Sequence, residues 1–236
     1  MKIMRFLPIF TLLMCGSISC IAQTQQEKPS SNISQMRQIY VQDQRDRGVL
    51  LSDAGQQIKP TANIKPPQQL DGATRMKRDA ARRQQVRVLL KAGEVTTAQD
   101  FHDAAFIFQH GDSPNDYLLA HILAVEAIVR GDASSKWISA STLDRYLHSI
   151  GKPQIFGTQY LSHDFLYIQQ HKNDSTAMSK FKPQPGMTQQ PYNELLIPDS
   201  LRLDYCVPNL MQQKKNLEEF EQGKYPEEIM PAGCTR

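Results

Sequence analysis

The sequence predicts a mainly α-helical protein, an antiparallel helical bundle followed by an irregular C-terminal region with room for a short β-hairpin. Apolar residues recur at helical spacing between residues 71 and 150, and several of these segments begin at Ser, Thr or Asp and end at Gly. The connections between them are short, which favours antiparallel neighbours. Of the 236 residues, 40% are apolar and 22% are charged, a composition that supports one sizeable core.

The helices are placed by their caps and their apolar stripes. A short helix begins at Ser34. The prolines of residues 58–67 then prevent another helix before Asp71, because proline lacks the amide donor that a helix needs. The main helices are expected at residues 71–92, 97–111, 113–131 and 134–150.

Two of these helices have faces that predict their packing. In the first, Val86 and Leu89 belong to the core-facing stripe, and the basic run of residues 75–87 is expected to be a solvated face. The alternative for that run is a binding patch for phosphate or anionic lipid. The helix at 113–131 is apolar on most sides and is therefore expected to be the central, buried helix. One of its stripes consists of Leu118, Ile122, Val125 and Val129.

Regular patterns weaken after Tyr160. Residues 165–168 are expected to form a short strand, residues 182–191 a loop rich in proline and glutamine, and residues 208–223 a last helix. The expected organisation is a signal peptide at 1–22, a polar tether with a short helix and a proline-rich linker at 23–70, a helical core domain at 71–160, and an irregular extension with a C-terminal helix packed on the core at 161–236.

The first 22 residues have the pattern of a secretory signal peptide: a basic start, a short apolar run, and small residues that end at Ala22. This pattern favours a secreted or periplasmic protein. The alternative is a lipoprotein anchored at Cys20, the one way in which we expect a membrane to be involved. In an oxidising compartment, the two cysteines outside this segment, Cys206 and Cys234, are expected to form a disulfide.

Charge and motif content argue against several classes of function. The formal net charge of +3 includes two basic residues of the signal segment, so the remainder is close to neutral and does not resemble a general nucleic-acid binder. Neither CxxC nor HxxxH spacing occurs, so no metal site is predicted. No glycine-rich phosphate loop and no Rossmann pattern is present, so we expect no cofactor.

Residues 151–160, GKPQIFGTQY, form the most specific connection in the chain. Pro153 prevents the preceding helix from resuming, and Gly157 permits a close backbone approach that a side chain would block. The two glutamines and Thr158 bring many polar groups into this loop. If the loop is buried, those groups must be satisfied internally or by a ligand.

Three motifs occur in order along the chain: QHG at residues 109–111, DR at Asp144 and Arg145, and the loop string GKPQIFGTQY. Together they resemble the core pattern of an uncharacterised bacterial family, a domain of unknown function recognised by a Gln-His pair, an Asp-Arg pair and a G-x-x-Q-x-(Tyr/Phe)-G-T-Q string. The resemblance covers residues 82–160.

Outside that range the sequence departs from the family pattern. Residues 161–190 look like an insertion, and Arg202 is the candidate for an arginine expected in the C-terminal segment.

The resemblance implies a shared polar constellation. Its candidates for ligand binding are Gln109, His110, Arg145, Gln154, Thr158 and Gln159. Its candidates for catalysis are His110, Asp144 and Arg145. One interpretation is a buried network that ties the loop to the helices. The other is a pocket in which Arg145 holds an anionic group and His110 transfers a proton.

Two classes of function remain. The first is a secreted or envelope-located helical module that binds an unknown small molecule or a protein, which the lack of cofactor motifs favours. The second is an enzyme, a hydrolase or lyase that uses His110 with Asp144 and Arg145. The sequence does not decide whether the chain is an enzyme. In either case we expect residues 154–159 to fold back against the helices that carry His110 and Arg145.

Overall fold

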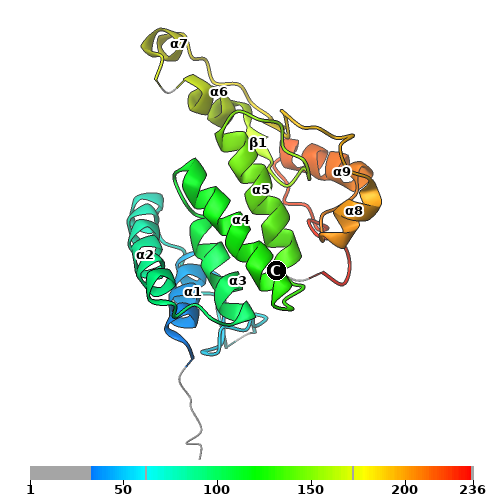
Figure 1. The fold of residues 1–236 in the computed structure, drawn as a ribbon. Helices are drawn as coiled ribbons and strands as arrows, with labels where there is room; N and C mark the ends of the chain where they lie inside the picture. The colour runs from blue at the N-terminus through cyan, green and yellow to red at the C-terminus, as the bar shows by residue number, and fades with distance from the viewer. Residues whose placement is uncertain (1–32, 62, 172, 235–236) are drawn as a thin grey trace, which may run out of the picture. The chain divides into compact units, whose positions relative to one another are not determined.

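Helices dominate the described part of the chain, which is residues 33–61, 63–171 and 173–234 of a computed structural model (Figure 1). The predicted mainly α-helical class, a helical bundle with an irregular C-terminal region, is confirmed. The predicted signal peptide lies outside the described residues. The elements are α1 (Gln35–Asp46), α2 (Gly72–Ala92), α3 (Ala98–Phe108), α4 (Pro114–Val129), α5 (Ser135–Ser149), β1 (Leu161–Ser162), α6 (His163–His171), α7 (Ser175–Ser179), β2 (Met187–Thr188), α8 (Asp199–Asp204) and α9 (Leu210–Glu221).

Side-chain caps set the helix starts that the sequence predicts. The side chains of Ser34, Asp71 and Ser113 each accept a hydrogen bond from the main-chain N–H three residues later. Thr97 and Asp100 form a reciprocal capping box at the start of α3. These caps satisfy N–H groups that have no partner within the helix, and they fix where α1 to α4 begin.

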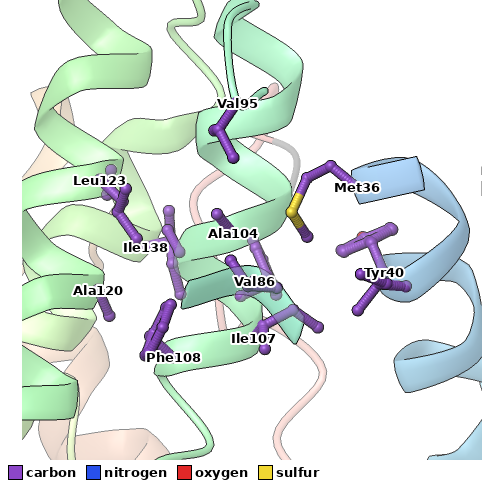
Figure 2. Close-up of a cluster of buried hydrophobic side chains, with 14 of the residues drawn as sticks. Met36, Tyr40, Val86, Val95, Ala104, Ile107, Phe108, Ala120, Leu123 and Ile138 are labelled. Atoms are coloured by element: carbon purple, nitrogen blue, oxygen red, sulfur yellow. The ribbon is translucent and has the colours of Figure 1, made fainter. Parts of the chain in front are cut away.

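The main apolar core lies among α1 to α5, and α3 is its most enclosed helix. Residues 104–108 of α3 are all buried. Met36 and Tyr40 of α1 pack against them (Figure 2), so α1 belongs to the same core as the helices after residue 71. Val86 and Leu89 of α2 are buried, as their spacing predicts.

α4 packs between α3 and α5, as the predicted central helix should, but the prediction that it is buried is wrong (Figure 1). Ile122 is 54% exposed and Val129 is 74% exposed, so the predicted stripe lies on the outer face. The buried residues of this helix are Asp116, Ala120, Leu123, Ala124 and Ala127. Small alanine side chains let neighbouring helices approach closely, and this close packing outweighs the larger apolar residues in setting the inner face.

The prediction of a solvated basic face on α2 is wrong for two of its arginines, because Arg82 and Arg83 are only 5% and 7% exposed. Arg82 forms ion pairs with Asp46 and Asp79. Arg83 pairs with Asp112 at 2.7 Å. Buried guanidinium groups need such partners, and the carboxylates come from α1, from α2 itself and from the turn before α4.

The C-terminal region packs on α5 through a second apolar cluster built around Ala140, Phe156 and Val207. The strands β1 and β2 pair antiparallel, with Leu161 opposite Thr188. The predicted strand at residues 165–168 is wrong, since this segment lies within α6. Its run of Phe, Leu, Tyr and Ile lacks the polar alternation of a half-buried strand, so its strand-favouring composition misled the prediction.

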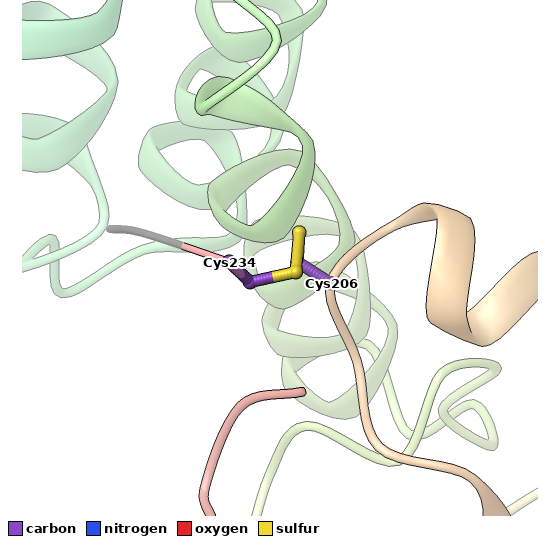
Figure 3. The surroundings of a disulfide bond; sticks show 2 residues. All are labelled: Cys206 and Cys234. Carbon is purple, nitrogen blue, oxygen red and sulfur yellow. A yellow bond between two sulfur atoms is a disulfide. The ribbon is translucent and has the colours of Figure 1, made fainter. Parts of the chain in front are cut away.

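A disulfide ties the C-terminal tail to the segment after α8. The structure joins Cys206 to Cys234, with their Cα atoms 5.7 Å apart (Figure 3). This pairing is the one that the sequence predicts. It closes the segment that contains α9 and the residues following that helix.

Candidate functional site

The carboxylate of Asp144 holds the loop that follows α5. Its Oδ1 accepts hydrogen bonds from the N–H groups of Ile155 (2.7 Å) and Phe156 (3.0 Å). Its Oδ2 accepts from the main-chain N–H (2.9 Å) and the hydroxyl (2.8 Å) of Thr158. Burial raises the pKa of Asp144, although the four donors oppose that rise. Asp144 is therefore an anchor for the loop, and both of its oxygens are engaged there.

Two glutamines complete the loop from within. The Gln154 side chain accepts from the Gln159 N–H (3.0 Å) and donates to the carbonyls of Gln159 (3.0 Å) and Gln189. The Gln159 side chain donates to the carbonyl of Ser141 on α5 at 3.2 Å. Both glutamine side chains are buried, and these bonds satisfy most of their polar groups. The loop is thus a closed hydrogen-bonded unit attached to α5.

Gly157 is the position where this loop meets the C-terminal region. Its φ angle is +82°, and a Cβ there would collide with the Gln213 carboxamide and the Tyr192 ring. Its carbonyl accepts a hydrogen bond from the side chain of Gln189 at 2.6 Å. The close approach expected at Gly157 is confirmed. The partners come from α9 and from the segment around β2, far away in the sequence.

Arg145 connects the same loop to the end of α3. Its Nε donates to Gln159 Oε1 (3.2 Å), and its Nη1 donates to the carbonyl of Gln109 (2.6 Å). The expected packing of the loop against the helices that carry His110 and Arg145 is therefore confirmed. Within the described residues, Arg145 forms no ion pair and its Nη2 has no hydrogen-bond acceptor. The guanidinium also lies over the Tyr117 ring, 5.9 Å from its centroid. Burial lowers the pKa of Arg145, but a guanidinium stays protonated at neutral pH, so its charge has no carboxylate counter-ion among the described residues.

A cavity of about 630 Å³ lies beside Arg145, between α1 with its following loop, α3 and α5. Tyr40 and Trp137 give it aromatic surface. Its polar wall residues include Arg37, Gln44, Arg47, Gln99, Gln109, His110 and Arg145. The volume lies within the range of small-molecule sites, and the wall is more polar than most of them.

The three guanidinium groups of the cavity wall differ in their partners. Arg37 pairs with Asp103 at 2.6 Å, and Arg47 pairs with Asp79 at 2.7 Å and with Asp43 at 2.8 Å. These carboxylates neutralise the two arginines of the α1 side. Arg145, on the α5 side, is the one that keeps its charge available to a bound molecule.

His110 presents a neutral imidazole to the cavity. Burial and the charges of Arg47 and Arg145 hold the pKa of His110 well below its usual range. Its Nε2 lies 3.7 Å from Asp43 Oδ2 and makes no hydrogen bond within the described part of the chain. Burial also raises the pKa of Asp43 to about 7. Of these two neighbouring groups, Asp43 is the one that exchanges a proton near neutral pH, and His110 stays neutral.

The predicted site residues divide into two groups. The cavity wall contains Gln109, His110 and Arg145. The network that ties the loop to α5 contains Asp144, Gln154, Thr158 and Gln159. The sequence analysis missed the wall residues of α1 and the loop after it. Tyr40, Gln44 and Arg47 recur at four- and three-residue spacing, which indicates one helix face and could have identified this wall.

Arg202, the candidate for the arginine of the family pattern, is 1% exposed and supports the loop from the C-terminal side. Its Nε donates to the Tyr192 hydroxyl at 3.1 Å, and that hydroxyl donates to the carbonyl of Phe156 at 3.1 Å. Its Nη1 pairs with Asp199 at 3.1 Å. Arg202 thus acts on the loop through Tyr192.

Comparison of the chain with protein-family models, curated proteins and solved structures finds no match. Among the described residues, no group of His, Cys, Asp and Glu side chains is arranged to hold a metal ion. In the same part of the chain, no helix has the length and apolar character needed to cross a bilayer.

Proposed function

We propose that this protein is a secreted or envelope-located module that binds a small anionic molecule in the cavity between α1, α3 and α5. The observation that carries this proposal is the charge of Arg145, which lines the cavity and has no carboxylate partner among the described residues. A cation withdrawn from water without a counter-ion is unfavourable. An anionic ligand would supply that counter-ion, and the planar guanidinium is suited to carboxylate or phosphate oxygens.

The remaining walls suit a ligand that also has hydrogen-bonding and flat surfaces. The amide side chains of Gln44, Gln99 and Gln109 line the cavity and offer both donors and acceptors. Tyr40 and Trp137 offer aromatic surface to the cavity. Within this proposal, Asp144 and the loop hold Arg145 in position, and the cavity residues contact the ligand.

Two features support the secreted or envelope location in this proposal. Residues 1–22 have the pattern of a signal peptide, and a disulfide is typical of an oxidising compartment. Mass spectrometry of the native protein is expected to find an N-terminus at Gln23, or a lipidated Cys20 under the alternative. An intact Met1 on envelope material would contradict both.

Titration of the isotope-labelled protein with propionate and with inorganic phosphate, followed by NMR, tests the binding site. At least one of the two anions is expected to cause saturable shifts at Gln109 and at the Arg145 side chain. Arg145→Gln should weaken that binding at least about tenfold, the equivalent of about 1.4 kcal/mol. Arg45→Gln is the matched control, because Arg45 lies on α1 and pairs with the exposed Asp53.

Two outcomes would overturn the proposal: no saturable binding of either anion, or equal binding by the wild type and by a folded Arg145→Gln variant. Arg145→Lys provides a second variant. It keeps the charge but loses the planar fork, so its affinity should lie between those of the wild type and Arg145→Gln.

The alternative function is an enzyme, and one observation favours it. His110 was expected to act with Asp144, but Asp144 is engaged by the loop and the carboxyl beside His110 is that of Asp43, at 3.7 Å. A neutral imidazole next to a carboxyl whose pKa is about 7 is suited to general acid–base chemistry. Hydrolysis of p-nitrophenyl acetate that disappears in His110→Gln, with propionate binding retained, would favour this alternative.

A further inference from the structure

A second, smaller cavity of about 260 Å³ is also lined by Arg145. Its walls are mostly apolar: Tyr160, Leu161, Val207, Pro208, Phe220 and Ile229. Arg145 is the one charged residue among the described residues that line it. The polar side chains of Thr158 and Gln159 also reach this cavity, but both are engaged in the loop network.

The two cavities share Trp137 and Arg145 as wall residues. Arg145 therefore borders the smaller cavity as well, so a molecule whose acidic group binds Arg145 can place an apolar body against the walls of that cavity. Arg145 lines both cavities, and the apolar walls belong to the smaller one. This order of polar and apolar surfaces matches a molecule with an acidic head and an apolar body.

We propose that the smaller cavity binds the apolar body of the ligand, and that the ligand class is amphipathic monocarboxylates, such as medium-chain alkanoates. This inference rests on the proposed function, since the same Arg145 binds the acidic group. A monocarboxylate matches the single uncompensated positive charge. A phosphate dianion would leave excess negative charge next to apolar walls, which is unfavourable.

The dimensions of the smaller cavity fit this ligand class. Its volume of about 260 Å³ exceeds the roughly 150 Å³ of a cavity that holds a benzene molecule. A short alkyl chain or a substituted aromatic ring therefore has room. Phe220 packs against Tyr160 with their ring centroids 5.0 Å apart, which gives one side of the cavity a rigid aromatic surface.

The C-terminal tail forms part of this wall. Ile229 lies in the segment closed by the Cys206–Cys234 disulfide, so this bond helps to hold Ile229 against the cavity. The wall is thus assembled from α9, from the loop after α5 and from the tail.

Isothermal titration calorimetry of the full chain with butyrate, hexanoate, octanoate and octanol tests the inference. Each added methylene that enters the cavity should lower the Kd about fourfold, from about 0.8 kcal/mol per buried methylene. Octanol lacks the acidic group and should bind at least about tenfold more weakly than octanoate. Butyrate and octanoate with the same Kd would overturn the apolar site while leaving the anion site in place. Octanol and octanoate with the same Kd would overturn the role of Arg145 in binding the head group.

Two variants fill the smaller cavity, so that one remains informative if the other fails to fold. Ile229→Trp and Leu161→Phe should each reduce the affinity for octanoate toward that for butyrate, without changing butyrate binding. Ile168→Trp is the control, because Ile168 lies on α6, is 39% exposed and does not line the cavity. Octanoate binding that is unchanged in both folded variants would overturn the inference. If phosphate binds but none of these alkanoates does, the ligand class inferred here is wrong. If neither phosphate, propionate nor any of these alkanoates binds, the proposed anion site itself is wrong.

Discussion

Replacing Asp144 with Asn measures how much of the loop's stability depends on one carboxylate. Each carboxylate oxygen of Asp144 accepts two hydrogen bonds from the loop. An Asn side chain keeps one oxygen and turns an NH₂ group toward two donors, so two of the four bonds are lost. At about 1.5–3 kcal/mol for each bond to a charged group, this loss costs about 3–6 kcal/mol. Removing a buried charge offsets part of that cost, so we expect about 3 kcal/mol.

Thermal and urea unfolding of Asp144→Asn give the measurement. For a chain of this size, 1 kcal/mol corresponds to about 2–4 °C, so Tm should fall by about 6–12 °C. Asp174→Asn is the matched control, because Asp174 also accepts bonds from main-chain N–H groups but at an exposed helix start. Asn caps a helix about as well as Asp, so this control should change the free energy of unfolding by less than about 0.5 kcal/mol.

An Asp144→Asn protein with the same Tm and the same urea midpoint as the wild type would refute this reasoning. The loop would then be held by its apolar anchors and by the two glutamines, and the carboxylate would be dispensable. Equal losses in Asp144→Asn and in the Asp174→Asn control would also refute it, because the argument depends on burial.

Three further predictions concern the rest of the fold. Gly157→Ala should lower the free energy of unfolding by about 3 kcal/mol because of its positive φ and its close neighbours, whereas Gly72→Ala, where a Cβ meets nothing within 4 Å, should not destabilise the protein. The folded-state pKa of about 7 for Asp43 exceeds the unfolded value of about 3.9, so the free energy of unfolding should fall as pH rises from about 4 to 7. Asp43→Asn should therefore flatten the dependence of Tm on pH, and an unchanged Tm profile in this variant would contradict the prediction. Thiol labelling of the unfolded protein should detect Cys206 and Cys234 only after reduction. Reduction should also lower the free energy of unfolding by roughly 3–4 kcal/mol, because the disulfide joins residues 28 positions apart.

Helix positions could be predicted from the sequence because their signals are local. A capping side chain acts on an N–H group three residues away, and Ser34, Asp71, Thr97 and Ser113 all do so in the structure. The packing of residues 154–159 against Arg145 was also predictable, because a buried loop with that many polar groups has to find partners nearby.

The inner faces and the cavity could not be predicted in the same way, because they depend on contacts between distant segments. The outer face of α4 carries larger apolar side chains than its inner face, so hydrophobicity alone points the wrong way. Burial of Arg82 depends on Asp46, a residue 36 positions away. The wall contributed by α1 becomes visible only when α1 packs on α3, since its residues belong to none of the three motifs.

The arginines of this protein provide an internal comparison for the role of Arg145. Five arginines with little side-chain exposure each pair with at least one carboxylate: Arg37, Arg47, Arg82, Arg83 and Arg202. The fold therefore supplies a counter-ion where an arginine is needed for structure alone. Asp144 and Arg145 are adjacent and project about 100° apart on α5, so Asp144 anchors the loop and cannot serve as that counter-ion. An arginine held by two hydrogen bonds, without a carboxylate and at the boundary of two cavities, is what a site for an external anion requires.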